Sequence, residues 1–135
     1  FSISDMSEVF SKDEANKALQ NGEVVFCACG TGHPYFSTDT GVVLRALELT
    51  CKEILLAKAI DGVYDKDPKK FPDAKKYDTL SIEEVVEKRL QVIDLSASIL
   101  CLENRLPMSV FSLEEEDGIF KALLGEHKGT RVTAD

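Results

Sequence analysis

The spacing of apolar residues along the chain predicts several short helices. Residues 11–14 and 81–84 each have the Ser-x-x-Glu pattern of a capping box, in which the two side chains satisfy backbone N–H groups at the start of a helix. The first box opens a helix that ends near Gly22, and the second opens a helix that continues through Leu90. The same spacing predicts further helices at residues 38–49, 94–104 and 118–124.

Apolar runs between these helices predict β-strands. The runs comprise residues 24–29, 53–57, 108–112 and 130–133, the last as an edge strand. The first run is continuous and ends at Gly30, which is typical of a strand that is buried on both faces of a parallel sheet. A charged, proline-containing loop follows the second run. The alternation of strands and helices predicts an α/β architecture with a mainly parallel sheet.

Length and composition are those of a single globular domain. The chain has 135 residues, of which 44% are apolar and 30% are charged. Its longest apolar runs are far shorter than the roughly 20 residues that a membrane span requires, so we expect a soluble protein with no membrane partner. The net charge of −8 argues against nucleic-acid binding, because the basic cluster at residues 66–76 is interleaved with aspartates.

The four cysteines suggest neither a zinc site nor a disulfide framework. They are Cys27, Cys29, Cys51 and Cys101, and they form no Cys-x-x-Cys pair and have no histidine at zinc spacing. Cys27 and Cys29 alternate with other apolar residues in the first predicted strand. We therefore expect these two side chains to be buried, reduced thiols.

Residues 30–39 combine the features of an anion-binding loop. They follow a predicted strand and lead into a predicted helix, whose free N–H groups attract anions. Two glycines let the backbone approach a ligand, and three hydroxyl groups lie nearby; these residues are Gly30, Gly32, Thr31, Ser37 and Thr38. The complete glycine patterns of a P-loop and of a dinucleotide fold are missing. The residues themselves predict a phosphate site without naming its ligand.

Several side chains of this loop have two interpretations. Asp39 would repel a phosphate unless Mg²⁺ or a lysine lay between them, so it either organises positive charge or only interacts favourably with the helix dipole. Tyr35 and Phe36 could stack on a base, although packing under the loop is the more common use of adjacent aromatic residues. His33 could donate a hydrogen bond to a phosphate or to a neighbouring carbonyl.

Residues 58–68 are a second candidate for ligand binding. They leave the end of a predicted strand with an aromatic ring and several charges. Tyr64 offers a stacking face, Asp67 an acceptor for an exocyclic amine, and Lys58 a positive charge for phosphates. A solvated turn is the alternative, and the spacing does not decide between them.

Five segments together resemble the bacterial uridylate (UMP) kinases of the amino acid kinase superfamily. They are G-T-G-H-P-Y-F-S-T-D at 30–39, D-G-V-Y-D-K-D-P at 61–68, P-D-A-K-K-Y-D at 72–78, L-P-M-S-V-F at 106–111 and G-E-H-K-G-T at 125–130. The resemblance implies the carboxy-terminal half of an amino acid kinase-like three-layer sandwich. It departs from the family at His33, where asparagine is common, and at residues 41–43, where the family is alanine-rich.

The resemblance also implies a reaction and the residues that take part in it. The ATP γ-phosphoryl group would pass to UMP, giving UDP and ADP, with Mg²⁺ as cofactor. UMP would be bound by Thr31, Gly32, His33, Pro34, Tyr35, Phe36, Ser37 and Thr38. Asp39 would be the catalytic carboxylate, and ATP would contact Lys58, Tyr64 and Asp67. Members of this family form cytoplasmic homohexamers and respond to GTP and UTP.

The resemblance covers only part of such a kinase. Members of the family have a preceding segment of about a hundred residues, which supplies a lysine, glycine-rich loops, an arginine and an aspartate to the phosphate and uridine sites. We therefore expect the 135 residues alone to lack much of the site. The alternatives are a fragment that binds nucleotide or assembles without turnover, and another amino acid kinase that acts on a carboxylate or a carbamate.

Overall fold

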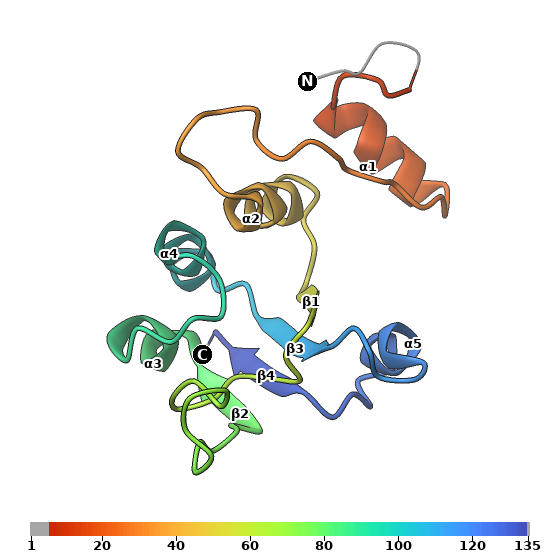
Figure 1. The fold of residues 1–135 in the computed structure, drawn as a ribbon. Coiled ribbons are helices and arrows are strands. Elements are labelled where there is room, and N and C mark those ends of the chain that lie inside the picture. Colours follow the sequence, from red (N-terminus) through yellow and green to blue (C-terminus); the bar gives the residue numbers. More distant parts are fainter. Residues whose placement is uncertain (1–5, 135) are drawn as a thin grey trace. The chain divides into compact units, whose positions relative to one another are not determined.

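The computed structural model describes residues 6–134, which divide into two compact units. The first unit, Phe1–Cys51, contains helices α1 (Lys12–Gln20) and α2 (Thr38–Glu48). The second unit, Lys52–Asp135, contains a four-stranded sheet and three helices (Figure 1).

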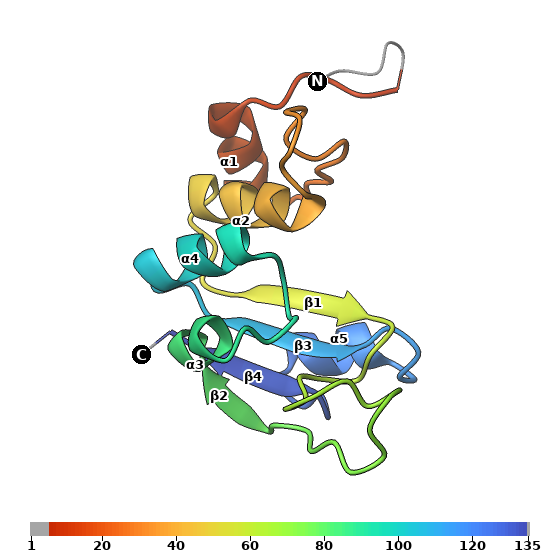
Figure 2. The ribbon, with the colours of Figure 1, turned by 60° about the vertical axis from the view of Figure 1, so that its left-hand side comes forward.

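The second unit is built around a mixed sheet with the strand order β1-β3-β4-β2. Its elements are β1 (Ile54–Lys58), β2 (Thr79–Ser81), α3 (Ile82–Glu87), α4 (Leu95–Glu103), β3 (Met108–Ser112), α5 (Gly118–Leu123) and β4 (Thr130–Thr133). β1 pairs with β3 in parallel, and so does β2 with β4, whereas β3 and β4 are antiparallel. Helices α3 and α4 lie on one side of this sheet and α5 on the other (Figures 1 and 2). The predicted α/β class and its three layers are confirmed.

Local capping determines where the helices begin. The Ser81 hydroxyl accepts the N–H of Glu84 at 3.1 Å, and the Glu84 carboxylate accepts the N–H of Ser81 at 3.2 Å, so the predicted capping box is complete. Asp94 caps α4 through the N–H of Ala97 at 2.8 Å. The N-cap of α2 is Ser37, so this helix begins at Thr38, the first residue of the predicted range 38–49.

The core of the second unit lies between the sheet and its helices. Four strand side chains at its centre are almost completely buried, namely those of Met108, Val110, Phe111 and Val132. Cys101 on α4 joins them, and burial raises the pKa of its thiol to about 11, which keeps the thiol protonated and unreactive. Among residues 6–134, no helix has the length and apolar character needed to span a membrane.

The expected buried strand at residues 24–29 is wrong. These residues belong to the described part of the first unit, but none of them is in a β-strand, and Cys29 has a positive φ of 71°. Val24 is 78% exposed and Phe26 is 92% exposed. The expected burial of the two thiols fails with it, because Cys27 is exposed and Cys29 is only half-buried. An apolar run becomes a buried strand only where neighbouring strands pair with its backbone and cover its faces.

The sheet differs from the expectation in two further places. Residues 79–81 form β2, a strand of three residues, which is too short to produce a recognisable alternation in the sequence. β4 is an inner strand and not an edge strand, because it pairs with β3 on one side and with β2 on the other. Its position depends on pairing between residues that are distant in sequence.

Candidate functional site

In the first unit the loop at residues 30–39 winds tightly before helix α2. Gly30 and Gly32 both have positive φ, +60° and +71°, which is the conformation that glycine adopts without steric cost. The Thr31 hydroxyl accepts the N–H of His33 at 3.1 Å. A Cβ atom placed on Gly41 would lie 3.4 Å from the Cα of Gly30, so the first turn of α2 lies directly against the loop.

The N-terminus of α2 has the features of an anion site. The Ser37 hydroxyl accepts N–H groups from Asp39 and Thr40 at 3.1 and 3.4 Å, which orients the first helical turn. Asp39 itself is half-buried in that turn. Backbone dipoles at a helix N-terminus attract phosphate, whereas a carboxylate in the same turn attracts cations. Together the helix N-terminus and Asp39 suit a phosphate that is bound as a complex with a cation.

The side chains at the tip of the loop are open to solvent. Tyr35 is fully exposed and Phe36 is 56% exposed, so in this unit neither ring packs under the loop. His33 and Pro34 are exposed as well. The packing interpretation of the two aromatic residues is therefore wrong here, and both rings are accessible to a ligand.

A pocket of about 320 Å³ adjoins the junction between this loop and α2. It is lined by Cys27, Ala28, Cys29, Gly30, Thr38, Gly41, Val42 and Arg45. The Arg45 guanidinium forms an ion pair with Glu48 and lies 3.8 Å from the centre of the Phe10 ring. Arg45 places a positive charge beside the loop, a feature that sequence reasoning missed, although Arg45 belongs to the predicted helix.

In the second unit the other candidate loop follows β1. Lys58, the last residue of that strand, is half-buried, and its ammonium group donates a hydrogen bond to the Val92 carbonyl. This bond holds the side chain near the carboxyl end of the strand. Parallel strands place ligand-binding loops at this end of a sheet.

Tyr64 is part of a charged network in this loop. Its hydroxyl donates a hydrogen bond to Asp61 at 2.8 Å, and the Lys76 ammonium contacts the other oxygen of Asp61 at 3.0 Å. Burial by itself would raise the pKa of Asp61, but the hydrogen bonds from Lys76 and Tyr64, with the charge of Lys76, lower it below its usual value. The hydrogen bond to Asp61 raises the pKa of Tyr64 above 10.0. The sequence singled out Tyr64 but neither Asp61, which binds its hydroxyl, nor Lys76, which binds Asp61.

This network predicts a measurable change in the titration of Tyr64. Replacing Asp61 with asparagine keeps an oxygen acceptor but removes the negative charge, so the pKa of Tyr64 should fall toward 10.0. A raised pKa stabilises the folded loop below pH 10.0, and this stabilisation is lost as the pH rises through the folded-state pKa. NMR of the tyrosine ring carbon that bears the hydroxyl measures the pKa directly. An unchanged pKa in Asp61→Asn would contradict the network, and Asp73→Asn, elsewhere in the same loop, is the control.

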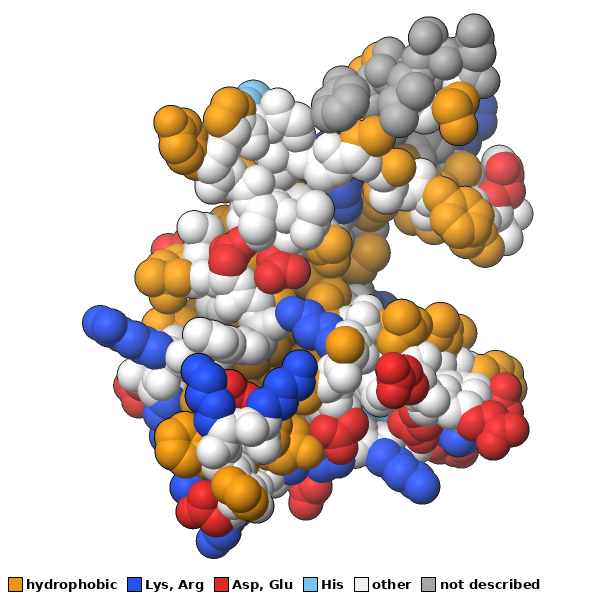
Figure 3. Space-filling view, viewed as in Figure 1, with side chains coloured by type: hydrophobic (Ala, Val, Ile, Leu, Met, Phe, Trp, Pro, Cys, Tyr) orange, Lys and Arg blue, Asp and Glu red, His pale blue; other side chains and the backbone are white. Residues whose placement is uncertain are grey.

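Asp67 organises the tip of the same loop. Its carboxylate accepts the N–H of Lys69 at 3.0 Å, and its other oxygen lies 3.8 Å from the Lys70 ammonium. Asp67 is exposed, as expected for an acceptor available to a ligand. Figure 3 shows acidic and basic side chains side by side around this loop, at the lower left, in agreement with the interleaved charges of the sequence.

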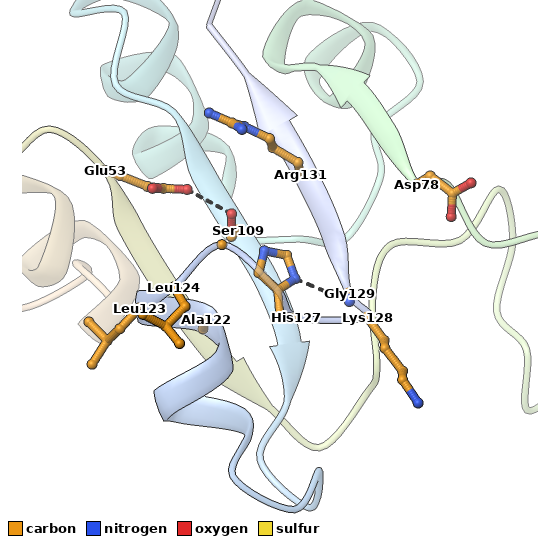
Figure 4. A pocket seen from close by; sticks show the side chains of 11 residues that line it. Glu53, Asp78, Ser109, Ala122, Leu123, Leu124, His127, Lys128, Gly129 and Arg131 are labelled. Carbon is orange, nitrogen blue, oxygen red and sulfur yellow. Dashed lines mark hydrogen bonds between the residues drawn. The ribbon is translucent and has the colours of Figure 1, made fainter.

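A pocket of about 490 Å³ lies elsewhere in the second unit (Figure 4). It is lined by Glu53, Asp78, Ser109, Ala122, Leu123, Leu124, Gly125, His127, Lys128, Gly129 and Arg131. The Ser109 hydroxyl donates a hydrogen bond to Glu53 at 2.7 Å, and the His127 ring accepts the N–H of Gly129 at 3.1 Å. These residues differ from those that the sequence predicts for nucleotide binding.

Sequence comparison relates the chain to known kinases. The model of the Amino acid kinase family matches residues 3–112. The chain belongs to this family. Within the family, it is 44% identical over 130 residues to a uridylate kinase of Psychrobacter sp. (strain PRwf-1). That match covers 96% of this chain and 54% of the relative, so the chain spans about half the length of this curated relative.

Solved structures support the same relationship. The chain is similar to the UMP kinase from Bacillus anthracis with a TM-score of 0.92 and 36% identity, covering 98% of this chain and 55% of that one. The UMP kinase from Ureaplasma parvum matches with a TM-score of 0.90 and 33% identity, covering 98% and 57%. The resemblance to the bacterial uridylate kinases is therefore confirmed.

The candidate residues of this family member fall into two sets. Residues 31–39 belong to the first unit, and Lys58, Tyr64 and Asp67 belong to the second. The structure brings Tyr64 together with Asp61 and Lys76, and it places Gly30 against the first turn of α2, which contains Thr38 and Asp39. Across the described ranges of both units, no three His, Cys, Asp or Glu side chains gather to hold a metal ion.

Proposed function

We propose that this chain is the nucleotide-binding part of a uridylate kinase, which transfers the γ-phosphoryl group of ATP to UMP. The observation that carries the proposal is the loop at residues 30–39, whose glycines, hydroxyls and helix N-terminus suit a phosphate. The 44% identity to a uridylate kinase supports UMP as the acceptor. The products would be UDP and ADP, as in pyrimidine nucleotide biosynthesis.

Residues 31–38 would hold UMP in this proposal. The N–H groups of the loop before α2 would donate toward its phosphate, with the dipole of α2 adding to the attraction, and the exposed ring of Tyr35 or Phe36 is available to the base. The Ser37 hydroxyl keeps that turn oriented, because it accepts two of the backbone N–H groups. Binding would therefore fix the acceptor oxygen of UMP relative to Asp39.

Asp39 would organise the positive charge at the reaction centre. Mg²⁺ usually binds through one or two carboxylates together with substrate phosphate oxygens, so a single half-buried carboxylate beside an anion site fits this cofactor. When bound, Mg²⁺ neutralises charge on the transferring phosphoryl group. Asp39 would contribute one oxygen ligand, or it would orient a lysine in the same role.

ATP would be held by the loop of the second unit. Tyr64 presents an aromatic face whose hydroxyl is fixed by Asp61, and Asp67 presents a carboxylate acceptor. Lys58 supplies positive charge for the phosphates, although in the present structure its ammonium is bound to the Val92 carbonyl. An oxygen of the UMP phosphate then forms a bond to the γ-phosphorus as the bond to the ADP oxygen breaks, so alignment and charge neutralisation carry the catalysis.

A substrate panel tests the proposal. The assay uses a protein of the relatives' length that contains this sequence, and it measures ADP release with ATP, Mg²⁺ and either UMP, CMP or glutamate. We expect turnover with UMP to exceed turnover with the other acceptors by at least about tenfold, since pocket contacts typically discriminate by this much or more. ADP release with UMP no higher than background would overturn the proposal, and preference for glutamate would favour another activity of the family.

The second candidate function is a nucleotide-binding or assembly fragment without turnover. The observation that favours it is the match to 54% of the relative's length. The isolated 135 residues should show turnover at least about 100-fold below that of the longer protein, because each missing phosphate-binding group removes on the order of 3 kcal/mol of transition-state stabilisation. A coupled assay on both proteins measures this, and equal turnover numbers would contradict it.

We propose a cytoplasmic protein that assembles into a homohexamer when the whole kinase is present, with GTP and UTP as effectors. Light scattering of the longer protein would measure the assembly, and the assay above would measure the response to each effector.

A further inference from the structure

The proposed ATP loop has two limbs, residues 63–65 and residues 75–77, that lie side by side in the second unit. Tyr77 donates its N–H to the Val63 carbonyl at 2.8 Å, and Asp65 donates its N–H to the Lys75 carbonyl at 3.0 Å. Tyr64 pairs with Lys76 in an isolated antiparallel bridge between these two bonds. The two limbs therefore form a short ladder whose base is the bond between Tyr77 and Val63. Tyr64 lies within the ladder, and Asp67 lies beyond its far end.

Thr130 on β4 joins both limbs at the base of this ladder. Its hydroxyl accepts the N–H of Val63 at 2.8 Å and donates to the Tyr77 carbonyl at 2.5 Å. Thr130 is completely buried, and it lies more than fifty residues from both partners in the sequence. A buried hydroxyl that both accepts and donates fixes the position of its two partners, because leaving either one unpaired is costly.

Two further contacts bring the same loop close to the closing segment of the chain. The Lys76 ammonium donates to the Lys128 carbonyl at 3.0 Å while it binds Asp61. A Cβ atom on Gly62 would lie 2.7 Å from the Thr130 hydroxyl oxygen, so glycine is required for the limb to approach Thr130 this closely. The loop is thus held at its base by β4 and by the residue two positions before it.

We infer that Thr130 is a positioning residue for ATP, because its hydroxyl holds the two limbs that carry Tyr64 and Asp67. This inference rests on the proposed function. Thr130 acts through the backbone of Val63 and Tyr77 and does not itself contact the nucleotide. Loss of its hydroxyl releases the base of the loop and should weaken ATP binding without changing the affinity for UMP, whose proposed site is in residues 31–38.

Kinetics of Thr130→Val and Thr130→Ser test this role in a protein of the relatives' length. Valine preserves the volume and removes both hydrogen bonds, so we expect the KM for ATP to rise by about tenfold, which corresponds to about 1.4 kcal/mol of binding free energy. The KM for UMP should stay within about twofold, a change below the contribution of one hydrogen bond. Thr130→Ser should restore most of the ATP affinity, because serine retains the hydroxyl. An unchanged KM for ATP in Thr130→Val would overturn the inference.

Two controls separate positioning from general loss of stability. Thr79→Val removes an exposed threonine hydroxyl from β2 in the same sheet, and it should leave both KM values unchanged. Ile82→Ala removes buried side-chain volume from α3, outside residues 58–78, and lowers stability. If Ile82→Ala raised the KM for ATP as much as Thr130→Val does, the effect would be one of stability and the inference would fail.

Hydrogen exchange gives a readout that does not depend on activity. In the 135-residue chain, Thr130→Val should accelerate amide exchange at Val63 by at least about tenfold relative to the wild type, because this N–H loses its acceptor. Unchanged exchange at Val63 would overturn the inference. Lys76→Met, which removes the second attachment at a partly exposed position, should also raise the KM for ATP and provides a variant if Thr130→Val does not fold.

The inference and the proposed function can fail separately. If Tyr64→Ala and Asp67→Ala raise the KM for ATP but Thr130→Val does not, the proposed ATP site remains and the positioning role is overturned. If the wild-type protein binds no ATP, the proposed function and the inference are both overturned.

Discussion

Gly129→Ala should destabilise the second unit by at least about 4 kcal/mol, the range reached only by severe steric or polar defects. A Cβ atom on Gly129 would lie 1.8 Å from the Val110 carbonyl oxygen and 2.9 Å from the Cα of Phe111. Both neighbours belong to β3, whose side chains form the centre of the core. Neither backbone can withdraw without breaking sheet pairing, so the added methyl group has no low-cost position.

Gly125→Ala is the matched control for this substitution. Gly125 ends the turn after α5 with φ +73°, and an added Cβ would have no atom within 4 Å. Alanine there should cost only about 1 kcal/mol, the strain of a left-handed backbone. Denaturant unfolding followed by circular dichroism measures both variants. Equal losses of stability in the two variants would show that the close contact with β3 is not what makes Gly129 necessary.

Asp39→Asn should lower kcat by at least about 100-fold, or roughly 3 kcal/mol, in a protein of the relatives' length. Asparagine keeps the shape of the side chain and removes the charge that would hold Mg²⁺ or a lysine at the transferring phosphoryl group. The affinity for UMP should change little, because uracil and ribose contacts are untouched. Steady-state kinetics for kcat and direct UMP titration give the two quantities separately.

Asp13→Asn distinguishes this role from a helix-dipole effect. Asp13 also lies in the first turn of its helix, α1, and is exposed. A carboxylate that only favours the dipole contributes about 0.3–1 kcal/mol to stability and nothing to turnover. Asp13→Asn should therefore leave kcat unchanged. If Asp39→Asn behaved like Asp13→Asn, Asp39 would have no catalytic role.

Features that depend on neighbouring residues were predictable from the sequence. The capping box at Ser81 is complete because its donors and acceptors are three residues apart. β3 begins and ends where its apolar run does, at Met108–Ser112. The loop at residues 30–39 was also recognisable, since its glycines, hydroxyls and following helix are contiguous in the chain. Family resemblance, and not the local pattern, connected this loop to UMP.

Features that depend on distant pairing were not predictable. Residues 24–29 have the composition of a buried strand, but no local signal can supply the partner strands that would bury them. The inner position of β4 is decided by its pairing with β2, a strand of three residues with no pattern of its own. The network around Tyr64 shows the same limit, because Lys76, which binds Asp61, lies fifteen positions further along the chain than Asp61.

The sequence by itself determined the helix starts, the α/β class and the family to which the chain belongs, because capping, periodicity and motif spacing are encoded within short segments. Only the tertiary structure decided which groups support the proposed ATP loop. Thr130 ends the family segment at 125–130, but the sequence assigns its hydroxyl no partner, and only folding buries that hydroxyl between Val63 and Tyr77. The physical reason is that a hydrogen bond acts over about 3 Å of space, whatever the separation along the chain.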